Sequence, residues 1–416
     1  MRDKIICVDL SKENKYIKNR ISTLRKQVMH MVSAKTRFWI LIALVFISGF
    51  SQGMILPLMG IILEQNDVSS AINGLHATGL YIGVLIASPF MEKPIRKFGF
   101  KPLIMLGGVL VFASLALFPV WQSLWFWFIL RVMIGIGDNM LHFGTQTWIT
   151  TTSVEESRGK NISYYGLSFG LGFTIGPLMT RLLEVHQALP FLVSAALSLA
   201  VWSLMFAVRN KFPEDDNFTT STSSISRFIQ TAKIAWVAFL PAFGYGFLEA
   251  TLHGIFPVYG LRIGHDVDLL SLIIPCFAAG SIITQIPLGM LSDKVGRRKI
   301  LLGVIAGGSA CFFLTAFFET SVIALFISFA VSGMLIGSLF SLSITFMTDL
   351  LPSSLLPAGN LMIGISFSIG SIIGPFLSGL FLDVFPGVSF FTVIIFMLAV
   401  LFITIYVKRD KHVQYS

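Results

Sequence analysis

The chain has 416 residues, of which 55% are hydrophobic and only 12% charged, and its mean hydropathy is +0.81. A soluble domain carries roughly twice that share of charge. The apolar residues form continuous blocks of about 20, the length of a helix that crosses the hydrocarbon core of a membrane. These blocks exclude a water-soluble fold, and because they do not alternate with polar residues they also exclude an outer-membrane barrel.

The net charge of +9 is distributed unevenly along the chain. All but three of the 30 Lys and Arg residues lie in the two tails or in the loops on one side of the apolar blocks; the exceptions are Arg131, Arg181 and Arg262. This is the positive-inside pattern, and it predicts that both termini are cytoplasmic. Basic tails also suit the anionic inner leaflet of a lipid bilayer, so we predict no nucleic-acid partner.

The first 36 residues are polar, and the apolar run after them is too long for a signal peptide and lacks a small-residue cleavage site. Met31 is an alternative start, which leaves open whether residues 1–30 belong to the native protein. The three cysteines, Cys7, Cys276 and Cys311, show neither paired nor metal-ligand spacing. We therefore predict no metal and no cofactor.

Twelve transmembrane helices are predicted in chain order. They lie near residues 38–63, 71–91, 102–120, 123–147, 160–183, 188–208, 233–261, 268–291, 299–318, 321–347, 357–382 and 387–407. The longest polar break contains an acidic cluster at 214–216 and a Ser/Thr run, and it cannot lie in lipid. The predicted organisation is a basic N-terminal tail (1–37), a six-helix half (38–208), a cytoplasmic linker (209–232), a second six-helix half (233–407) and a short tail (408–416).

The two halves repeat each other at an ungapped offset of 198 residues. Gly166 aligns with Gly364, and the Gly-Pro pair at 176–177 aligns with the pair at 374–375. An even number of helices in each half makes the repeats parallel, related by a pseudo-two-fold axis along the membrane normal. The predicted fold class is therefore an all-α membrane protein of two six-helix bundles with a cavity between them.

The loop after the eighth span reads G-M-L-S-D-K-V-G-R-R-K from Gly289. Gly289 permits close helix approach, Gly296 permits a tight turn, and Asp293 can accept charge-assisted hydrogen bonds. The run resembles the G-x-L-[AS]-D-[KR]-x-G-R-[RK] signature of the major facilitator superfamily, and the resemblance extends over about residues 38–407. It implies the major facilitator fold. It also implies a cytoplasmic gate motif made of Gly289, Asp293, Gly296, Arg297 and Arg298.

The matching loop of the first half departs from this signature. Arg96 stands where the family has an acidic residue, and Glu92 lies one turn earlier. Either Glu92 substitutes or the first-half gate is weak, so we do not extend the gating role to this loop.

The fifth span resembles the G-x(3)-G-P pattern of antiporters within the family, and the eleventh span repeats it. The antiporter-like helix motif consists of Gly172, Gly176, Pro177, Gly370, Gly374 and Pro375. Small residues four positions apart let helices pack closely in lipid, and proline bends a helix. Helix packing alone would also explain these glycines, but the resemblance favours export.

Polar residues recur on one face of the fourth span. Arg131 and Asp138 are two turns apart, and His142 follows Asp138 by one turn. Charged side chains in mid-membrane are costly, so they normally face protein or a water-filled cavity. Asp138 and His142 could also simply satisfy each other, and Arg131 could be structural.

Glu249 and His253 show the same spacing on the seventh span. The resemblance implies that the first, fourth, seventh and tenth helices line the central cavity. We predict that Glu249 and Asp138, one acid in each half, couple transport to protons. The predicted cavity residues that bind substrate are Arg131, His142, His253, Gln52, Tyr245 and Tyr259. A metal site built from the two acids and two histidines is the less favoured alternative.

The predicted function is proton-coupled secondary transport by alternating access, in which a monomer in a bacterial plasma membrane exports a small amphipathic molecule, drug-like or metallophore-like. The alternatives are a proton symporter that imports a small metabolite, a lipid or glycolipid flippase and, from another class, a non-transporting membrane sensor. No nucleotide-binding loop or nucleophile–base pair is present, so we predict that the chain is not an enzyme. The sequence leaves the cargo and the proton stoichiometry open.

Overall fold

The computed structural model describes residues 10–153, 155–213, 224–352 and 355–408, and the side chains of 10–33, 92, 155–159, 224–227 and 357 are not described. All secondary structure in this part is helical. In chain order the elements are α1 (Leu10–Gln65), α2 (Ser70–Ala87), η1 (Ser88–Phe90), α3 (Glu92–Phe98), α4 (Phe100–Leu117), α5 (Leu124–Thr152), α6 (Glu155–Ile175), η2 (Gly176–Glu184), α7 (Leu189–Ser203), η3 (Leu204–Ala207), α8 (Ser224–Gly254), α9 (Phe256–Arg262), α10 (Val267–Val295), α11 (Arg297–Thr315), α12 (Val322–Ile336), α13 (Leu339–Leu350), α14 (Leu356–Val384) and α15 (Phe391–Val407).

These helices follow the predicted spans in order and confirm an all-α membrane protein. Within the described residues, 10 helices are long and apolar enough to cross a membrane, and α15 is a shorter apolar helix. Helix α1 begins inside the predicted N-terminal tail, and α8 begins inside the predicted linker. Cys7, the acidic cluster at 214–216, the side chain of Glu92 and nearly all of the tail 408–416 lie outside the described part.

The seventh span is broken, although the sequence predicts one continuous helix. Helix α8 ends at Gly254 and α9 begins at Phe256. Pro257 lies in the first turn of α9, and because it has no N–H it cannot bond to the carbonyl of His253. The break changes the direction in which the side chains after it point, including that of Tyr259.

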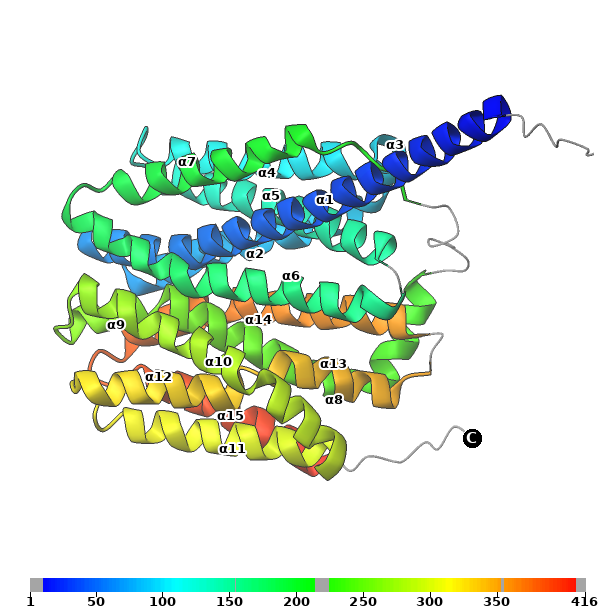
Figure 1. Cartoon of the computed structure of the whole chain (residues 1–416). Coiled ribbons are helices and arrows are strands. Elements are labelled where there is room, and N and C mark those ends of the chain that lie inside the picture. Colours follow the sequence, from blue (N-terminus) through cyan, green and yellow to red (C-terminus); the bar gives the residue numbers. More distant parts are fainter. Residues whose placement is uncertain (1–9, 154, 214–223, 353–354, 409–416) are drawn as a thin grey trace, which may run out of the picture.

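The first-half helices, α1 to α7, lie above the second-half helices, α8 to α15, in Figure 1, and the helices run along a common direction. The described ends of the chain lie at the same end of the bundle, at the right of the view. We call that end the terminal face and the opposite end, which carries Gln65 and Val384, the far face. The positive-inside prediction makes the terminal face cytoplasmic.

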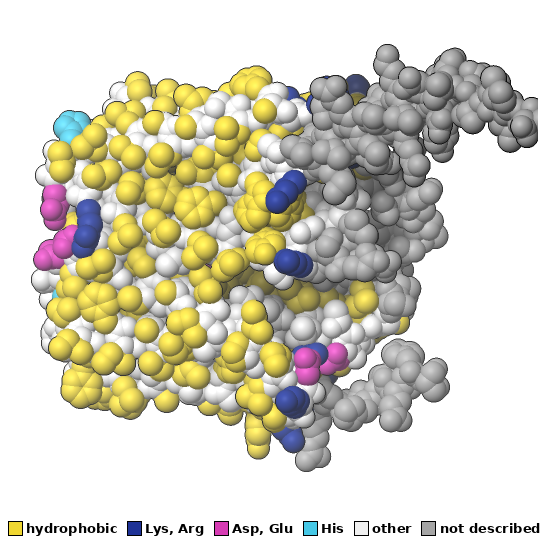
Figure 2. Space-filling model, in the orientation of Figure 1, with side chains coloured by type: hydrophobic (Ala, Val, Ile, Leu, Met, Phe, Trp, Pro, Cys, Tyr) yellow, Lys and Arg dark blue, Asp and Glu magenta, His cyan; other side chains and the backbone are white. Residues whose placement is uncertain are grey.

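The surface between the two ends is mostly hydrophobic (Figure 2), and the charged side chains seen in this view lie towards the ends. Many large apolar side chains are exposed there, among them Ile323 and Phe396, at 72% and 71%. A soluble protein would bury this area, but lipid tails solvate it.

The two halves are joined at the far face by a polar network. Arg262 donates to both carboxylate oxygens of Glu64, at 2.6 and 3.0 Å, and its guanidinium lies 3.8 Å from Asp383. Asp383 accepts hydrogen bonds from the backbone amides of Ser70 and Ala71, at 3.0 and 2.8 Å. A second-half carboxylate therefore caps the N-terminus of first-half helix α2. We call these five residues the far-face network.

Backbone packing closes the same face. A Cβ added at Gly74 of α2 would overlap the carbonyl of Pro375, and one added at Gly379 of α14 would overlap that of Ser70. A second ion pair, from Arg181 to Asp268 at 2.5 Å, joins η2 to α10. The far face is thus closed by direct contact between the halves.

The terminal face differs. A Cβ added at Gly166 of α6, Gly289 of α10 or Gly364 of α14 would meet no atom within 4 Å. These helices are among those that join the halves elsewhere, yet near the terminal face their glycines border open space. At these three glycines the helices are therefore not packed closely against a neighbour, whereas the far face is closed by direct contact between the halves.

Asp383→Asn is expected to weaken the closed far face, because the amide has no charge for Arg262 or for the helix N-terminus. A carboxylate at such a terminus is worth about 0.3–2 kcal/mol, which shifts the balance between the conformations closed at the far face and at the terminal face by up to about thirtyfold. Spin labels at Ile162→Cys and Met290→Cys, in a cysteine-free background, would measure the distance between the halves at the terminal face. The shift would appear as a larger fraction of molecules with a short distance between the labels. The matched control is Asp266→Asn, an exposed helix-capping acid within the second half. An unchanged distance distribution in Asp383→Asn would show that the network does not hold the far face.

Candidate functional site

A hydrogen-bonded cluster lies between three helices of the first half. Ser48 of α1 donates to Asp138 Oδ1 of α5 at 2.6 Å, and the same hydroxyl lies 3.0 Å from His142 Nε2. His142 Nδ1 lies 2.6 Å from the hydroxyl of Tyr165 on α6. The cluster thus runs from a carboxyl group through a hydroxyl and an imidazole to a phenol.

Asp138 lies about midway along α5 and is only 1% exposed. Gln52, one turn beyond Ser48 on α1, lies beside its carboxyl group. Its second oxygen, Oδ2, is buried without a hydrogen-bond partner. An ionised carboxylate left this poorly solvated is costly, so this environment favours the neutral acid.

Arg131 is not brought to Asp138, although the two residues share a face of α5. Its Nη2 donates to the backbone carbonyl of Ile55 at 3.0 Å, while Nε and Nη1 are buried without partners. The guanidinium also lies close enough to Tyr81 and His76 to interact with them electrostatically. Arg131 therefore ties α5 to α1 deep within the first half.

The second acid, Glu249, lies in a different environment on α8. Tyr245, one turn earlier, donates to its Oε1 at 3.2 Å. Aromatic rings from three further helices surround the pair: Phe367 lies 6.1 Å from Tyr245 and 6.3 Å from Tyr81 of the first half, and Phe340 lies 5.5 Å from Phe367. Glu249 and Tyr245 are both partly exposed. This carboxyl is therefore lined by aromatic rings from both halves and is not sealed.

The remaining two predicted cavity residues of the seventh span lie towards the far face. His253 Nδ1 bonds to the backbone carbonyl of Glu249 at 2.8 Å, and its ring lies 4.6 Å from Phe173 of the first half. Tyr259 donates to Glu319 at 2.6 Å, and Ser389 donates to the other oxygen of that carboxylate at 2.6 Å. The structure thus places Tyr259 in a loop network of the second half, not beside Glu249.

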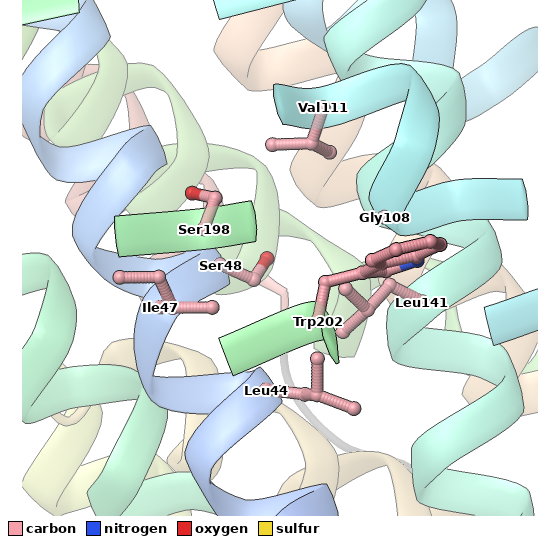
Figure 3. Close-up of a pocket in the computed structure, with 8 residues that line it drawn as sticks. All are labelled: Leu44, Ile47, Ser48, Gly108, Val111, Leu141, Ser198 and Trp202. Carbon is pink, nitrogen blue, oxygen red and sulfur yellow. The ribbon is translucent and has the colours of Figure 1, made fainter. Parts of the chain in front are cut away.

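A small pocket lies behind Ser48 (Figure 3). It is lined by Leu44, Ile47, Ser48, Gly108, Val111, Leu141, Ser198 and Trp202. It offers about 10 Å³ to the centre of a water molecule, room for one water. A pocket of this size is too small to be a cargo site.

The gate motif runs from the end of α10 into α11 and forms the predicted tight turn between them. Gly296 has a φ of 104°, a conformation that glycine adopts without strain. Arg297 pairs with Asp293 and donates to Asp349 at 3.3 Å, and Arg298 donates to the Ile405 carbonyl at 3.0 and 3.1 Å. These bonds all stay within the second half.

The antiporter-like glycines have a packing role in this structure. A Cβ at Gly172 would overlap the carbonyl of Phe46 on α1, and one at Gly370 would overlap that of Phe243 on α8. Gly176 and Gly374 pack on the same two helices one turn later. Contact between α6 and α1, and its repeat between α14 and α8, accounts for these glycines whatever the direction of transport.

Several site residues were not predicted from the sequence, namely Ser48, Tyr165, Tyr81, Phe340 and Phe367. Only Ser48 carried a usable signal, since it precedes the predicted Gln52 by one turn on the same helix. Within the described residues, no group of three or more His, Cys, Asp or Glu side chains could hold a metal ion.

Comparison with known proteins places this geometry in a family. The model of the Major Facilitator Superfamily matches residues 41–274 and 238–415. The uncharacterized MFS-type transporter YfkF of Bacillus subtilis is 52% identical over 91% of this chain and 97% of its own length. Multidrug resistance protein 2 of the same organism is 25% identical over 84% of this chain and 89% of its own length.

Solved structures show the same fold. The nucleoside transporter NupG superposes with a TM-score of 0.74 at 13% identity, over 89% of this chain and 99% of its own. A bacterial homologue of the lysosomal transporter Spinster, in an inward-facing and unoccupied conformation, gives a TM-score of 0.69 at 16% identity, over 89% of this chain and 94% of its own. The chain belongs to the Major Facilitator Superfamily and is a multi-pass membrane transporter, not an enzyme.

Proposed function

We propose that this chain is a proton-coupled antiporter that exports a small amphipathic molecule by alternating access. One observation carries the proposal. Each half holds one acid within a transmembrane span: Asp138 lies midway along α5 in a sealed cluster, and Glu249 lies about one turn before the end of α8 among aromatic rings. Two rigid halves that rock about such a site can expose it first to one side of the membrane and then to the other.

The two acids have complementary roles in this cycle. Glu249 is the acid that cargo can reach, since it is partly exposed and lined by the rings of Tyr245, Phe340 and Phe367. Aromatic faces take up the apolar part of an amphipathic molecule, and the carboxyl group takes its polar or cationic part. Asp138, which is sealed, carries the proton. The similarity to a multidrug resistance protein supports a drug-like cargo, and a metallophore-like one fits the same chemistry.

The proposal includes the setting of the transporter. It acts as a monomer in a bacterial plasma membrane with both termini in the cytoplasm, as two six-helix halves (38–208 and 233–407) joined by the linker 209–232. In that orientation the closed far face is extracellular, and an exporter would collect its cargo at the terminal face. The basic tails and loops support the orientation.

The test uses inside-out vesicles energised with a proton gradient and loaded with a pH-sensitive dye. Adding amphipathic cations such as tetraphenylphosphonium, or a metallophore, should release protons from the vesicles. Glu249→Gln and Asp138→Asn should each reduce this response at least about tenfold, since the first removes the charge that receives the cargo and the second removes the proton carrier. Glu184→Gln, which changes an exposed far-face acid, is the matched control.

Two other outcomes would overturn the assignment. Proton-driven transport that survives Glu249→Gln together with Asp138→Asn would remove the acids from coupling. Cargo uptake into the cell along with protons would make the protein an importing symporter instead.

A further inference from the structure

Asp138 and its nearest partner are both shielded from water. The side chains of Asp138 and Ser48 are each 1% exposed. The pocket behind Ser48 holds at most about one water and is lined mainly by Leu, Ile, Val and Trp, so it gives bulk water no path to the carboxyl. Gln52, the other side chain beside the carboxyl, is partly exposed, but an amide does not relay protons as hydroxyl and imidazole groups do. We therefore expect a proton that enters or leaves Asp138 in this conformation to pass through neighbouring side chains.

One continuous set of proton-transferring groups leads away from Asp138. The successive separations are 2.6 Å to Ser48, 3.0 Å from Ser48 to His142, and 2.6 Å from His142 to the hydroxyl of Tyr165. Exposure rises along this order, because His142 and Tyr165 are partly exposed. Gly166, the residue after Tyr165 on α6, borders the open space of the terminal face.

We propose that Ser48, His142 and Tyr165 form the proton path between Asp138 and the terminal face. This inference rests on the proposed function for its role in the cycle, but the path itself is a property of these four side chains. It gives Ser48 and Tyr165 a part in proton transfer, and it makes His142 a proton carrier as well as a lining residue.

The transfer balances at each atom. When Asp138 is protonated, its O–H points to Ser48 Oγ, the Ser48 hydroxyl points to His142 Nε2, and His142 Nδ1–H points to the oxygen of Tyr165. The Asp138 O–H bond then breaks as a new O–H bond forms on Ser48, whose original proton passes to Nε2. Nδ1 gives its proton to Tyr165, which releases its own to water. One proton has left Asp138, and the imidazole has changed tautomer.

After this transfer the hydrogen bonds run in the opposite direction. Tyr165 now donates to Nδ1, Nε2–H donates to Ser48, and Ser48 donates to the ionised Asp138. Both directions use the same distances and need no movement of heavy atoms. The second orientation is also the one that accepts a proton from the terminal face.

The surroundings of His142 contain few competing groups. Its ring packs edge-on against Phe169 at 5.0 Å and Tyr165 at 5.9 Å. Arg131, the cation on the same helix, lies three turns away and is bonded to the Ile55 carbonyl. Tyr165 is the titratable group that contacts the imidazole, Asp138 is joined to it through Ser48, and Ser48 and Phe169 are its uncharged neighbours.

The second half provides an internal contrast. Glu249 has Tyr245 as its hydroxyl partner, and both are partly exposed. An acid that water can reach needs no chain of carriers, and none of this length surrounds Glu249 among the described hydrogen bonds. The extended chain is present where the acid is sealed.

The experiment follows Asp138 itself, so it needs no cargo. Purified protein in proteoliposomes receives a rapid pH jump, and the C=O stretching band of the protonated carboxyl, identified by its loss in Asp138→Asn, is followed by infrared spectroscopy. Tyr165→Phe keeps the ring but cannot pass a proton. The rate at which the band changes after the pH jump should therefore fall at least about tenfold, while the final amplitude of the band stays that of the wild type. The control is Tyr164→Phe, the exposed neighbour on the same helix.

A second variant separates a path from a merely structural cluster. Ser48→Ala should slow the band as Tyr165→Phe does, and Ser48→Thr, which restores a hydroxyl, should recover the wild-type rate. Wild-type kinetics in Tyr165→Phe would overturn the path. Failure of the proposed function would give a different result. The wild-type protein would then release no protons with any cargo in the vesicle assay, while the effects of the variants on the infrared kinetics would be unchanged.

Discussion

Gly172→Ala and Gly370→Ala are each expected to prevent the protein from folding, whereas Gly166→Ala and Gly364→Ala should fold like the wild type. The first pair faces the backbone of a neighbouring helix, and an added Cβ would overlap a carbonyl group. The second pair has no atom within 4 Å of the added Cβ. All four positions lie on α6 or its repeat α14, so the change in helix propensity is the same in each variant.

The size of the effect follows from what the methyl group meets. Overpacking against side chains costs about 1–3 kcal/mol, because side chains can change rotamer. A backbone carbonyl within a helix cannot, so the whole helix must move and lose its contacts with α1 or α8. The measurement is size-exclusion chromatography of detergent extracts with a thermal melt of each variant. A Gly172→Ala protein that elutes and melts like the wild type would contradict the packing.

The sequence predicts much of the fold because membrane insertion depends on local composition. Continuous apolar blocks place the helices, and charge asymmetry predicts their orientation. The turn at Gly296 is also a local property and was predicted. The break at the end of α8 was missed because its signal, Pro257, is a single residue, and other prolines, such as Pro57 in α1, lie inside continuous helices.

The candidate site was predicted only in part, because side-chain partners depend on packing between distant segments. Helical spacing placed Arg131 and Asp138 on one face of α5, yet the long arginine side chain reaches the Ile55 carbonyl instead. Tyr165 looked like one aromatic residue among many, and only the approach of α6 to α5 brings its hydroxyl to His142.

The far-face network shows the same limit. Arg262 is conspicuous as one of the few cations outside the basic loops, but its partners Glu64 and Asp383 lie in segments far away in the chain. The repeat alignment could not find them, because these contacts join the halves and do not recur within each. Contacts between the halves are those that alternating access must break and remake, so the sequence is least informative where the mechanism acts.

Gly289→Leu is expected to give a folded protein that no longer transports. Gly289 of α10 borders open space at the terminal face, so a leucine fits the conformation seen here. The closed far face brings α2 and α14 together through Gly74 and Gly379, with backbone against backbone. Closing the terminal face by an equivalent movement must bring α10 against the first half, and a leucine side chain at 289 would then obstruct the contact.

An obstruction of this kind costs about 3 kcal/mol, which lowers the population of the conformation closed at the terminal face about a hundredfold. Transport should fall with that population while the thermal melt stays unchanged. Gly303→Leu is the matched control, because Gly303 is equally open but lies on α11, away from the contacts between the halves. Spin labels at Ile162→Cys and Met290→Cys would measure the separation of the two halves at the terminal face. In Gly289→Leu only the long separation should appear, whereas in Gly303→Leu both the long and the short separations should appear. Normal transport by Gly289→Leu would mean that the terminal face closes without bringing this part of α10 into contact, and that the gate motif acts by another movement.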